Sequence, residues 1–244
     1  MIRIHELIKE YDGHRAVNSL SLSVEPGEIV GLVGPNGAGK TSTLRCLAGI
    51  IPLTGGAIEI CGHDIVNDAV AARQHLAFVP DEPHLFDYLT VRDHMALFAR
   101  LYGVENAAER AEQLLTESAL WDRKDDFPGE LSRGMKQKLI LSCALLHDPK
   151  VLILDEPLTG LDPAAMRRVK KTVVATAEAG TSVLVSSHML HLVEEICGRI
   201  IIIQQGEKAV EGSLDSIRAA LPGLEGDANL EEIFLKATGL DEES

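Results

Sequence analysis

The sequence predicts an α/β fold with a largely parallel sheet and an inserted α-helical subdomain. Short, continuously apolar runs alternate along the chain with stretches of helical spacing. Such runs are typical of strands buried on both faces, and their alternation with helices indicates a parallel sheet. Between about residues 84 and 148 helical patterns follow one another without a strand, so we place the insertion there. A chain of 244 residues is long enough for one such domain.

Strand patterns dominate the N-terminal part of the chain. They occupy residues 2–11, 17–24, 29–33 and 54–62. The third of them, IVGLV, is apolar throughout, and the glycine-rich stretch GPNGAGKTS (34–42) follows it. Helical spacing then continues up to Pro52. We expect an N-terminal antiparallel β subdomain beside the parallel core.

The expected helical subdomain begins with a capping box. Thr90 and Asp93 stand at its two positions ahead of VRDHMALFARLYG, and Gly103 ends that helix. A second amphipathic helix is expected over AAERAEQLLTESALW (107–121). The polar and basic stretch LSRGMKQKL (131–139) runs directly into the apolar ILSCALL, which predicts the start of a third helix.

The buried-strand pattern returns at VLILDEP (151–157). Asp162 as the N-cap and Pro163 at the first helical position then predict a helix that ends at Gly180. Three further elements are expected: a strand at 182–188, a short helix at 189–197 and a hairpin at 199–212. All these segments belong to a single expected domain, residues 1–224.

The charge of the chain is strongly acidic, above all at its end. Residues 225–244 carry seven acidic side chains against Lys236 as the one basic residue, so we expect a solvated acidic C-terminal tail. The net charge of the whole chain is −14. This charge argues against nucleic acid as a partner, because binding to phosphates needs a basic surface.

The sequence also bears on where the protein works. No apolar run approaches the roughly 20 residues that a membrane-spanning helix needs. The N-terminus carries too many charges for a signal peptide, and the four cysteines form no C-x-x-C pair, which suits a reducing cytosol. We therefore expect a cytoplasmic chain that would reach a membrane only through a separate partner.

The stretch after IVGLV has the spacing G-x-x-x-x-G-K-[ST] of a phosphate-binding loop. Its residues are Gly34, Pro35, Asn36, Gly37, Ala38, Gly39, Lys40 and Thr41, with Ser42 directly behind them. In such a loop the backbone N–H groups and the following helix N-terminus point at one anion. Lys40 would reach the β- and γ-phosphates and Thr41 would bind Mg²⁺, which predicts a P-loop NTPase core. The alternative is a glycine-rich turn with an incidental lysine.

Two adjacent acids end the apolar run VLILDEP. Asp155 would emerge at the carboxyl end of a parallel strand, where ligands of such sheets bind, and we expect it to bind Mg²⁺. Glu156 would polarise a water towards the γ-phosphate. Without a phosphate loop such a pair would more often cap a helix. The two motifs together predict nucleotide hydrolysis but leave kinases, GTPases and helicases open.

The stretch LSRGMKQ between these motifs resembles the signature of ABC ATPases, usually L-S-G-G-Q. Other features match the family in its order along the chain: Tyr11 the aromatic that stacks on adenine, 34–41 the phosphate loop, 131–135 the signature, 151–156 the acidic strand, 158–162 the D-loop and His188 the switch histidine. Nearly the whole chain therefore resembles one nucleotide-binding domain of an ABC transporter.

The resemblance implies a paired enzyme. In the family two domains bind head-to-tail, and each ATP lies between one phosphate loop and the other subunit's signature, where Ser132 and Gly134 would contact it. Glu156 and His188 would act in hydrolysis, with ATP and Mg²⁺ as ligands. A second nucleotide-binding domain, either this chain or a relative, and an integral membrane permease are the implied partners. The chain would then lie in the cytoplasm at the inner face of the membrane.

The sequence departs from the family pattern at three positions. Asp81 stands where the family has a glutamine that binds Mg²⁺ and contacts the membrane subunit; a carboxylate can still bind the metal, but it adds a charge beside ATP. Arg133 replaces the first glycine of the signature and Met135 its glutamine. Arg133 adds a cation near a phosphate-facing helix end, although its side chain could equally face solvent.

The amino-acid sequence of several stretches, among them the ending LEEIFLKATG, resembles that of the ATPase subunits of type-two ABC exporters. This resemblance predicts a role in export. Two other classes stay open. A soluble ABC protein acting on ribosomes or DNA usually carries two cassettes or a long coiled coil, and the sequence has neither. A P-loop kinase of another family leaves the signature and His188 unexplained. The cargo is not encoded in this chain, since the permease recognises it.

Overall fold

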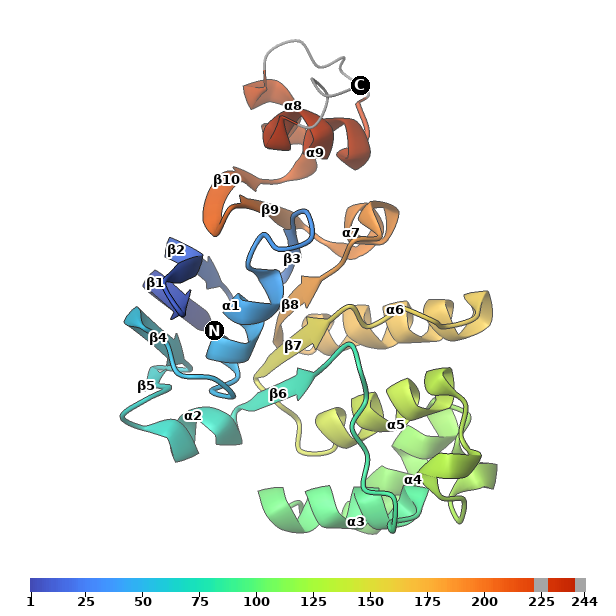
Figure 1. Ribbon diagram of the computed structural model, residues 1–244. Coiled ribbons are helices and arrows are strands. Elements are labelled where there is room, and N and C mark those ends of the chain that lie inside the picture. The colour runs from blue at the N-terminus through green and yellow to red at the C-terminus, as the bar shows by residue number, and fades with distance from the viewer. Residues whose placement is uncertain (222–227, 240–244) are drawn as a thin grey trace.

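The computed structural model describes residues 1–221 and 228–239, and its core is a six-stranded sheet in the order β10-β9-β3-β8-β7-β6 (Figure 1). The strands are β3 (Ile29–Val33), β6 (Leu76–Val79), β7 (Val151–Asp155), β8 (Ser182–Ser186), β9 (Arg199–Gln204) and β10 (Glu207–Gly212). All neighbours are parallel except β9 and β10, which form an antiparallel hairpin. The prediction of a largely parallel core is confirmed.

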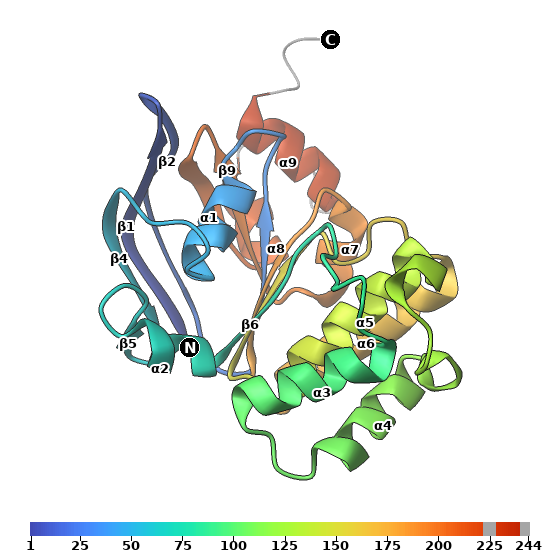
Figure 2. The same cartoon turned by 60° about the horizontal axis from the view of Figure 1, so that its bottom comes forward.

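An antiparallel sheet lies beside this core, as the sequence predicted. It contains β1 (Ile2–Tyr11), β2 (His14–Val24), β4 (Gly55–Ile60) and β5 (His63–Asp64) in the order β2-β1-β4-β5. Helix α1 (Lys40–Leu47) lies between the two sheets (Figure 2). Its buried Leu44 and Leu47 share one hydrophobic cluster with side chains of both sheets, so α1 and the loop before it are held from two sides.

The insertion between β6 and β7 contains three main helices with a core of their own. These are α3 (Val91–Tyr102), α4 (Ala107–Glu117) and α5 (Arg133–Leu145). Thr90 and Asp93 form the predicted capping box, and Gly103 ends α3 in the left-handed region at φ 64°. The apolar faces of the three helices meet around Met95, Leu115 and Leu139, so the insertion packs as a separate layer (Figure 2).

The rest of the core alternates strands and helices as expected. Helix α6 (Pro163–Glu178) follows β7, and α7 (Leu190–Ile196) follows β8. The short α2 (Ala69–Gln74), which was not predicted from the sequence, precedes β6. The Asp162 carboxylate caps α6 by accepting from the backbone N–H groups of Ala164 and Ala165, both at 2.9 Å. None of the helices described within 1–221 and 228–239 is both long and apolar enough to cross a membrane.

Part of the expected acidic tail, residues 225–244, forms the packed helix α9 (Leu230–Thr238). Helices α8 (Leu214–Ala220) and α9 pack against the β9 end of the sheet (Figure 1). Leu230 and Ile233 are fully buried there, because they stand on one face of a helix whose acids, Glu231 and Glu232, stand on another. The expectation is wrong for residues 230–238; residues 225–227 and 240–244 of the predicted tail lie outside the described residues.

Candidate nucleotide-binding site

The loop between β3 and α1 has no room for a side chain at two of its glycines. Gly39, the N-cap of α1, has φ 102°, and a Cβ there would lie 2.3 Å from the carbonyl oxygen of Ala16. At Gly34 a Cβ would lie 2.4 Å from the carbonyl oxygen of Ile203. The loop is therefore pressed against both sheets, and its path depends on the absence of side chains at these points.

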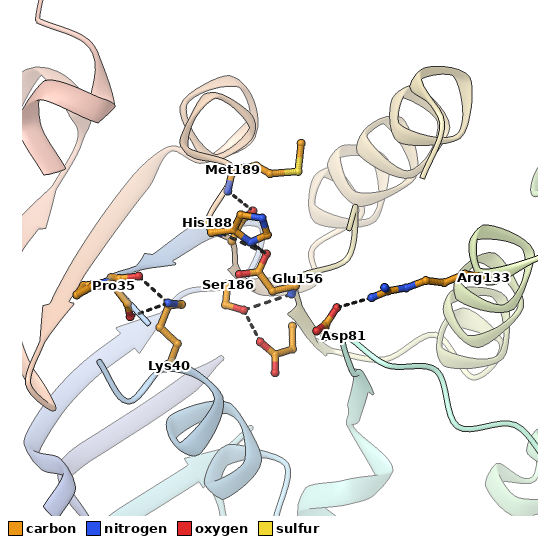
Figure 3. A network of polar contacts seen from close by, with 11 residues as sticks. Pro35, Lys40, Asp81, Arg133, Glu156, Ser186, His188 and Met189 are labelled. Atoms are coloured by element: carbon orange, nitrogen blue, oxygen red, sulfur yellow. Dashed lines mark hydrogen bonds and ion pairs between the residues drawn. The ribbon is translucent and has the colours of Figure 1, made fainter. Parts of the chain in front are cut away.

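Lys40 is the first residue of α1 and points back across the loop (Figure 3). Its Nζ donates to the carbonyl oxygens of Gly34 at 2.6 Å and Pro35 at 3.1 Å. Burial lowers the pKa of this amine, and the nearby carboxylates of Glu156 and Asp155 oppose part of that shift. A buried ammonium at a helix N-terminus is an arrangement that attracts anions.

Segments that are distant in the sequence line one cavity of about 460 Å³ around this loop. Its lining residues are His14, Ala16, Asn36, Gly37, Ala38, Gly39, Lys40, Thr41, Ser42, Asp81, Glu156, Thr159 and His188. Residues 36–42 of the predicted site, both predicted catalytic residues and Asp81 thus meet at one place, whereas Gly34, Pro35 and Asp155 do not line this cavity. Sequence reasoning missed His14 and Ala16, and it included Thr159 only as part of the D-loop stretch 158–162. His14 and Ala16 come to the cavity because β2 pairs with β1 next to Tyr11, a tertiary contact that the sequence does not show.

The two acids at the end of β7 are held by the neighbouring strand β8. Asp155 is 4% exposed, and its Oδ1 atom accepts a hydrogen bond from the Ser186 hydroxyl at 2.5 Å. The Oδ2 atom takes no part in that bond. The backbone N–H of Glu156 lies 3.1 Å from the Ser186 carbonyl oxygen and 3.3 Å from its hydroxyl oxygen. Ser186 therefore fixes both acids, a role that the sequence did not predict because it depends on the register of two strands.

Glu156 turns out of the strand direction and meets His188. Its φ is 49°, a left-handed value that is uncommon for a residue other than glycine and is often found at functional sites. The carboxylate oxygen Oε2 accepts from the His188 backbone N–H at 3.2 Å and lies 2.7 Å from the ring Nδ1 (Figure 3). The two residues predicted to be catalytic are thus in direct contact.

Tyr11 lies at the edge of the loop. The residue is 42% exposed, its hydroxyl is 3.4 Å from the hydroxyl of Ser42, and the ammonium of Lys9 lies 4.6 Å from the ring centroid. Tyr11 is not among the residues that line the cavity, although a neighbour of its hydroxyl is. An exposed flat ring next to a phosphate loop is suitable for stacking on a base.

The signature residues stand apart from the cavity of their own chain. Ser132 caps α5 by accepting from the Met135 backbone N–H at 3.3 Å, and its side chain is exposed. Gly134 lies in the first turn, where a Cβ would come within 3.1 Å of a Leu161 methyl carbon. Neither residue lines the phosphate cavity. Arg133 does not simply face solvent: it forms an ion pair with Asp81.

A parallel sheet with a glycine-rich loop after β3 and two acids at the end of β7 is the arrangement of a P-loop NTPase. Residues 17–159, more than half of the chain, match the sequence family described as ABC transporter. The chain belongs to this family.

Two relatives support this assignment. The chain is 41% identical over 214 residues to the Nod factor export ATP-binding protein I of Burkholderia pseudomallei (strain 1710b). The aligned residues cover 87% of this chain and 70% of the relative. It is 35% identical over 243 residues to the ABC-type transporter ATP-binding protein EcsA of Bacillus subtilis (strain 168). Here the aligned residues cover 99% of this chain and 98% of the relative.

The fold is also similar to solved structures. A structure described as an ATP binding subunit of an ABC transporter has a TM-score of 0.92 and 33% identity, covering 97% of this chain and 99% of that one. A dimeric ATP-binding cassette in a post-hydrolysis state, bound to ADP and Pi, has a TM-score of 0.78 at 24% identity and supports the fold alone. The chain is thus an ATP-binding, ATP-hydrolysing subunit of the ABC transporter family.

Proposed function

We propose that this chain pairs head-to-tail with a second nucleotide-binding domain around two ATP molecules and so drives a separate membrane permease. One observation supports the proposal that two domains pair. Ser132 and Gly134 stand at an exposed N-terminus of the long helix α5, yet they do not line the cavity that contains Lys40 of the same chain. A helix N-terminus attracts phosphate, so the signature is suited to an ATP bound by another subunit.

The nucleotide site in this proposal consists of the loop and its neighbours. The residues that bind ATP are Tyr11, Gly34, Pro35, Asn36, Gly37, Ala38, Gly39, Lys40, Thr41 and Ser42, with Ser132 and Gly134 from the partner domain. The buried ammonium of Lys40 supports this role, because it already lies among the oxygens of the loop and can exchange carbonyl oxygens for phosphate oxygens.

The donor atoms around the cavity fit Mg²⁺. This metal prefers oxygen ligands and binds through one or two carboxylates together with phosphate oxygens. Thr41 and Asp81 line the cavity, and the buried Asp155 has one oxygen outside its bond to Ser186, so we propose these three as metal ligands. Bound Mg²⁺ would supply positive charge that neutralises the phosphates.

Hydrolysis in this proposal depends on Glu156 and His188. Glu156 orients a water and accepts its proton, since its carboxylate lines the cavity beside the phosphate loop. His188 holds that carboxylate through the 3.2 Å backbone contact and the 2.7 Å ring contact. Lys40 binds the phosphates during the reaction and keeps them in reach of the water.

The names of two relatives support a role in export at a membrane. One relative is named for export and another as a transporter ATP-binding protein. We therefore propose a cytoplasmic chain at the inner face of the membrane, bound there by an integral membrane permease. Co-purification of the tagged chain with one membrane protein would support this location. Recovery with ribosomes or DNA in place of a membrane protein would contradict it.

Glu156→Gln tests the hydrolytic part of the proposal. The amide keeps the shape of the side chain but cannot accept a proton, so turnover should fall by about 10²-fold or more while ATP still binds. Size-exclusion chromatography with ATP should then show an accumulated dimer. Normal hydrolysis by the variant would show that Glu156 is not the group that accepts the proton of the water. Failure to bind ATP would show that the substitution damages the nucleotide site.

A further inference from the structure

Two positions at which the chain departs from its family are joined in the structure. The Arg133 Nη2 atom donates to Oδ1 of Asp81 at 3.2 Å, although the residues are 52 positions apart in the sequence. Asp81 stands just after β6, and Arg133 is the first residue of α5 (Figure 3). The pair therefore connects the parallel core to the helical subdomain at the edge of the phosphate cavity.

A second contact keeps α5 in place beside the segment after β6 that contains Pro80 and Asp81. Gln137, one turn after Arg133, is 4% exposed and donates from Nε2 to the carbonyl oxygen of Pro80 at 3.2 Å. The stem of Arg133 lies on the backbone of Gly160, where an added Cβ would come 3.3 Å from its Cδ atom. The stem is thus supported at one end, and the guanidinium reaches Asp81 from a defined position.

The carboxylate of Asp81 is a disadvantage for a phosphate site. Asp81 lines the same cavity as loop residues 36–42 and Glu156, and the buried Asp155 is close enough to act on the charge of Lys40 in that cavity. Each carboxylate repels a triphosphate, and the aqueous cavity reduces this repulsion without abolishing it. Asp81 binds Arg133 through Oδ1, so the guanidinium neutralises the charge and leaves Oδ2 outside the pair.

We propose that Arg133 is a positioning residue for Asp81: it holds and neutralises this carboxylate, so that the cavity accepts ATP despite the extra acid. The inference rests on the proposed nucleotide site. Both side chains are about half exposed, at 53% and 48%, and such pairs contribute little to folding. The main effect of the pair is therefore on the ligand, and Arg133 compensates for Asp81 within one chain.

A double-mutant cycle on ATP affinity tests the proposal. The dissociation constant of a fluorescent ATP analogue is measured at low salt in EDTA, where Asp81 can have no part in binding metal. Arg133→Ala should raise the dissociation constant about three- to fivefold, since it leaves Asp81 unpaired in the cavity. Asp81→Asn in the Arg133→Ala background should restore the wild-type value, and Arg133→Lys should keep most of it.

Salt dependence and a control variant at another ion pair show whether the effect on ATP affinity comes from the Arg133–Asp81 pair. The effect of Arg133→Ala should vanish at about 1 M salt, where charges are screened within about 3 Å. Arg92→Ala removes an equally exposed partner of Asp125 in the helical subdomain and should not change ATP affinity. If wild type fails to bind ATP, the proposed site is wrong. If wild type binds but Arg133→Ala changes nothing, or Asp81→Asn does not rescue it, the inference alone is overturned.

Discussion

Glu156 and its contacts illustrate what single residues contribute to this site. Its positive φ of 49° directs the carboxylate towards His188, and Ser186 holds its backbone N–H. The sequence could predict Glu156 and His188, because each follows a recognisable apolar strand. It could not predict Ser186 or the Asp81–Arg133 pair, because these contacts depend on strand register and on how the helical subdomain packs on the core.

His188→Ala tests whether the histidine acts through Glu156. Removal of the ring leaves the backbone N–H contact at 3.2 Å but removes the 2.7 Å ring contact, so the carboxylate loses its fixed orientation. Turnover should fall about ten- to hundredfold while the dissociation constant for ATP changes little. The measurement is steady-state hydrolysis beside equilibrium ATP binding. A loss of affinity with unchanged turnover at saturating ATP would assign His188 to binding alone.

At the scale of helices and strands, local signals predicted most elements. The capping box of Thr90 and Asp93 and the Asp162 cap each fix a helix start within a few residues, so sequence and structure agree there. Helix α9 escaped prediction because its acidic composition concealed the apolar stripe of Leu230 and Ile233. Such a stripe becomes informative only when the end of the sheet that it covers is known.

Thr90→Ala tests how much the capping box stabilises the helical subdomain. The Thr90 side chain accepts from the Asp93 backbone N–H, and the Asp93 carboxylate accepts from the Thr90 backbone N–H. Loss of the cap should lower the free energy of unfolding by about 1 kcal/mol. Urea unfolding of wild type and variant, followed by circular dichroism, measures the difference. No difference at neutral pH would show that the helix start is held by packing instead.

The capping box also predicts a pH dependence. Hydrogen bonds from the Thr90 hydroxyl and backbone lower the pKa of the Asp93 carboxyl. A lowered pKa in the folded state means that the contribution is present above the ordinary carboxyl pKa and is lost as the pH falls through the folded-state pKa. The difference between wild type and Thr90→Ala should therefore shrink in strong acid and persist at neutral pH.

At the scale of the whole molecule, the residues proposed to form the nucleotide site lie in two places. Loop residues 36–42, Glu156 and His188 share one cavity, whereas Ser132 and Gly134 stand outside it at the start of α5. The fold itself was predictable, because the alternation of strands and helices is local. The separation of the signature from the loop is a tertiary property, and it underlies the claim that two domains share each ATP.

Mixing two inactive variants tests that claim most directly. Lys40→Ala removes the phosphate-binding ammonium, and Ser132→Arg places a bulky side chain at the signature; each is combined with Glu156→Gln to retain bound ATP. If each site uses the loop of one subunit and the signature of the other, a mixed dimer has one doubly altered site and one intact site. Neither variant alone should dimerise with ATP, but an equimolar mixture should form dimers with about one ATP each. A mixture that stays monomeric, or either variant dimerising alone, would contradict the account.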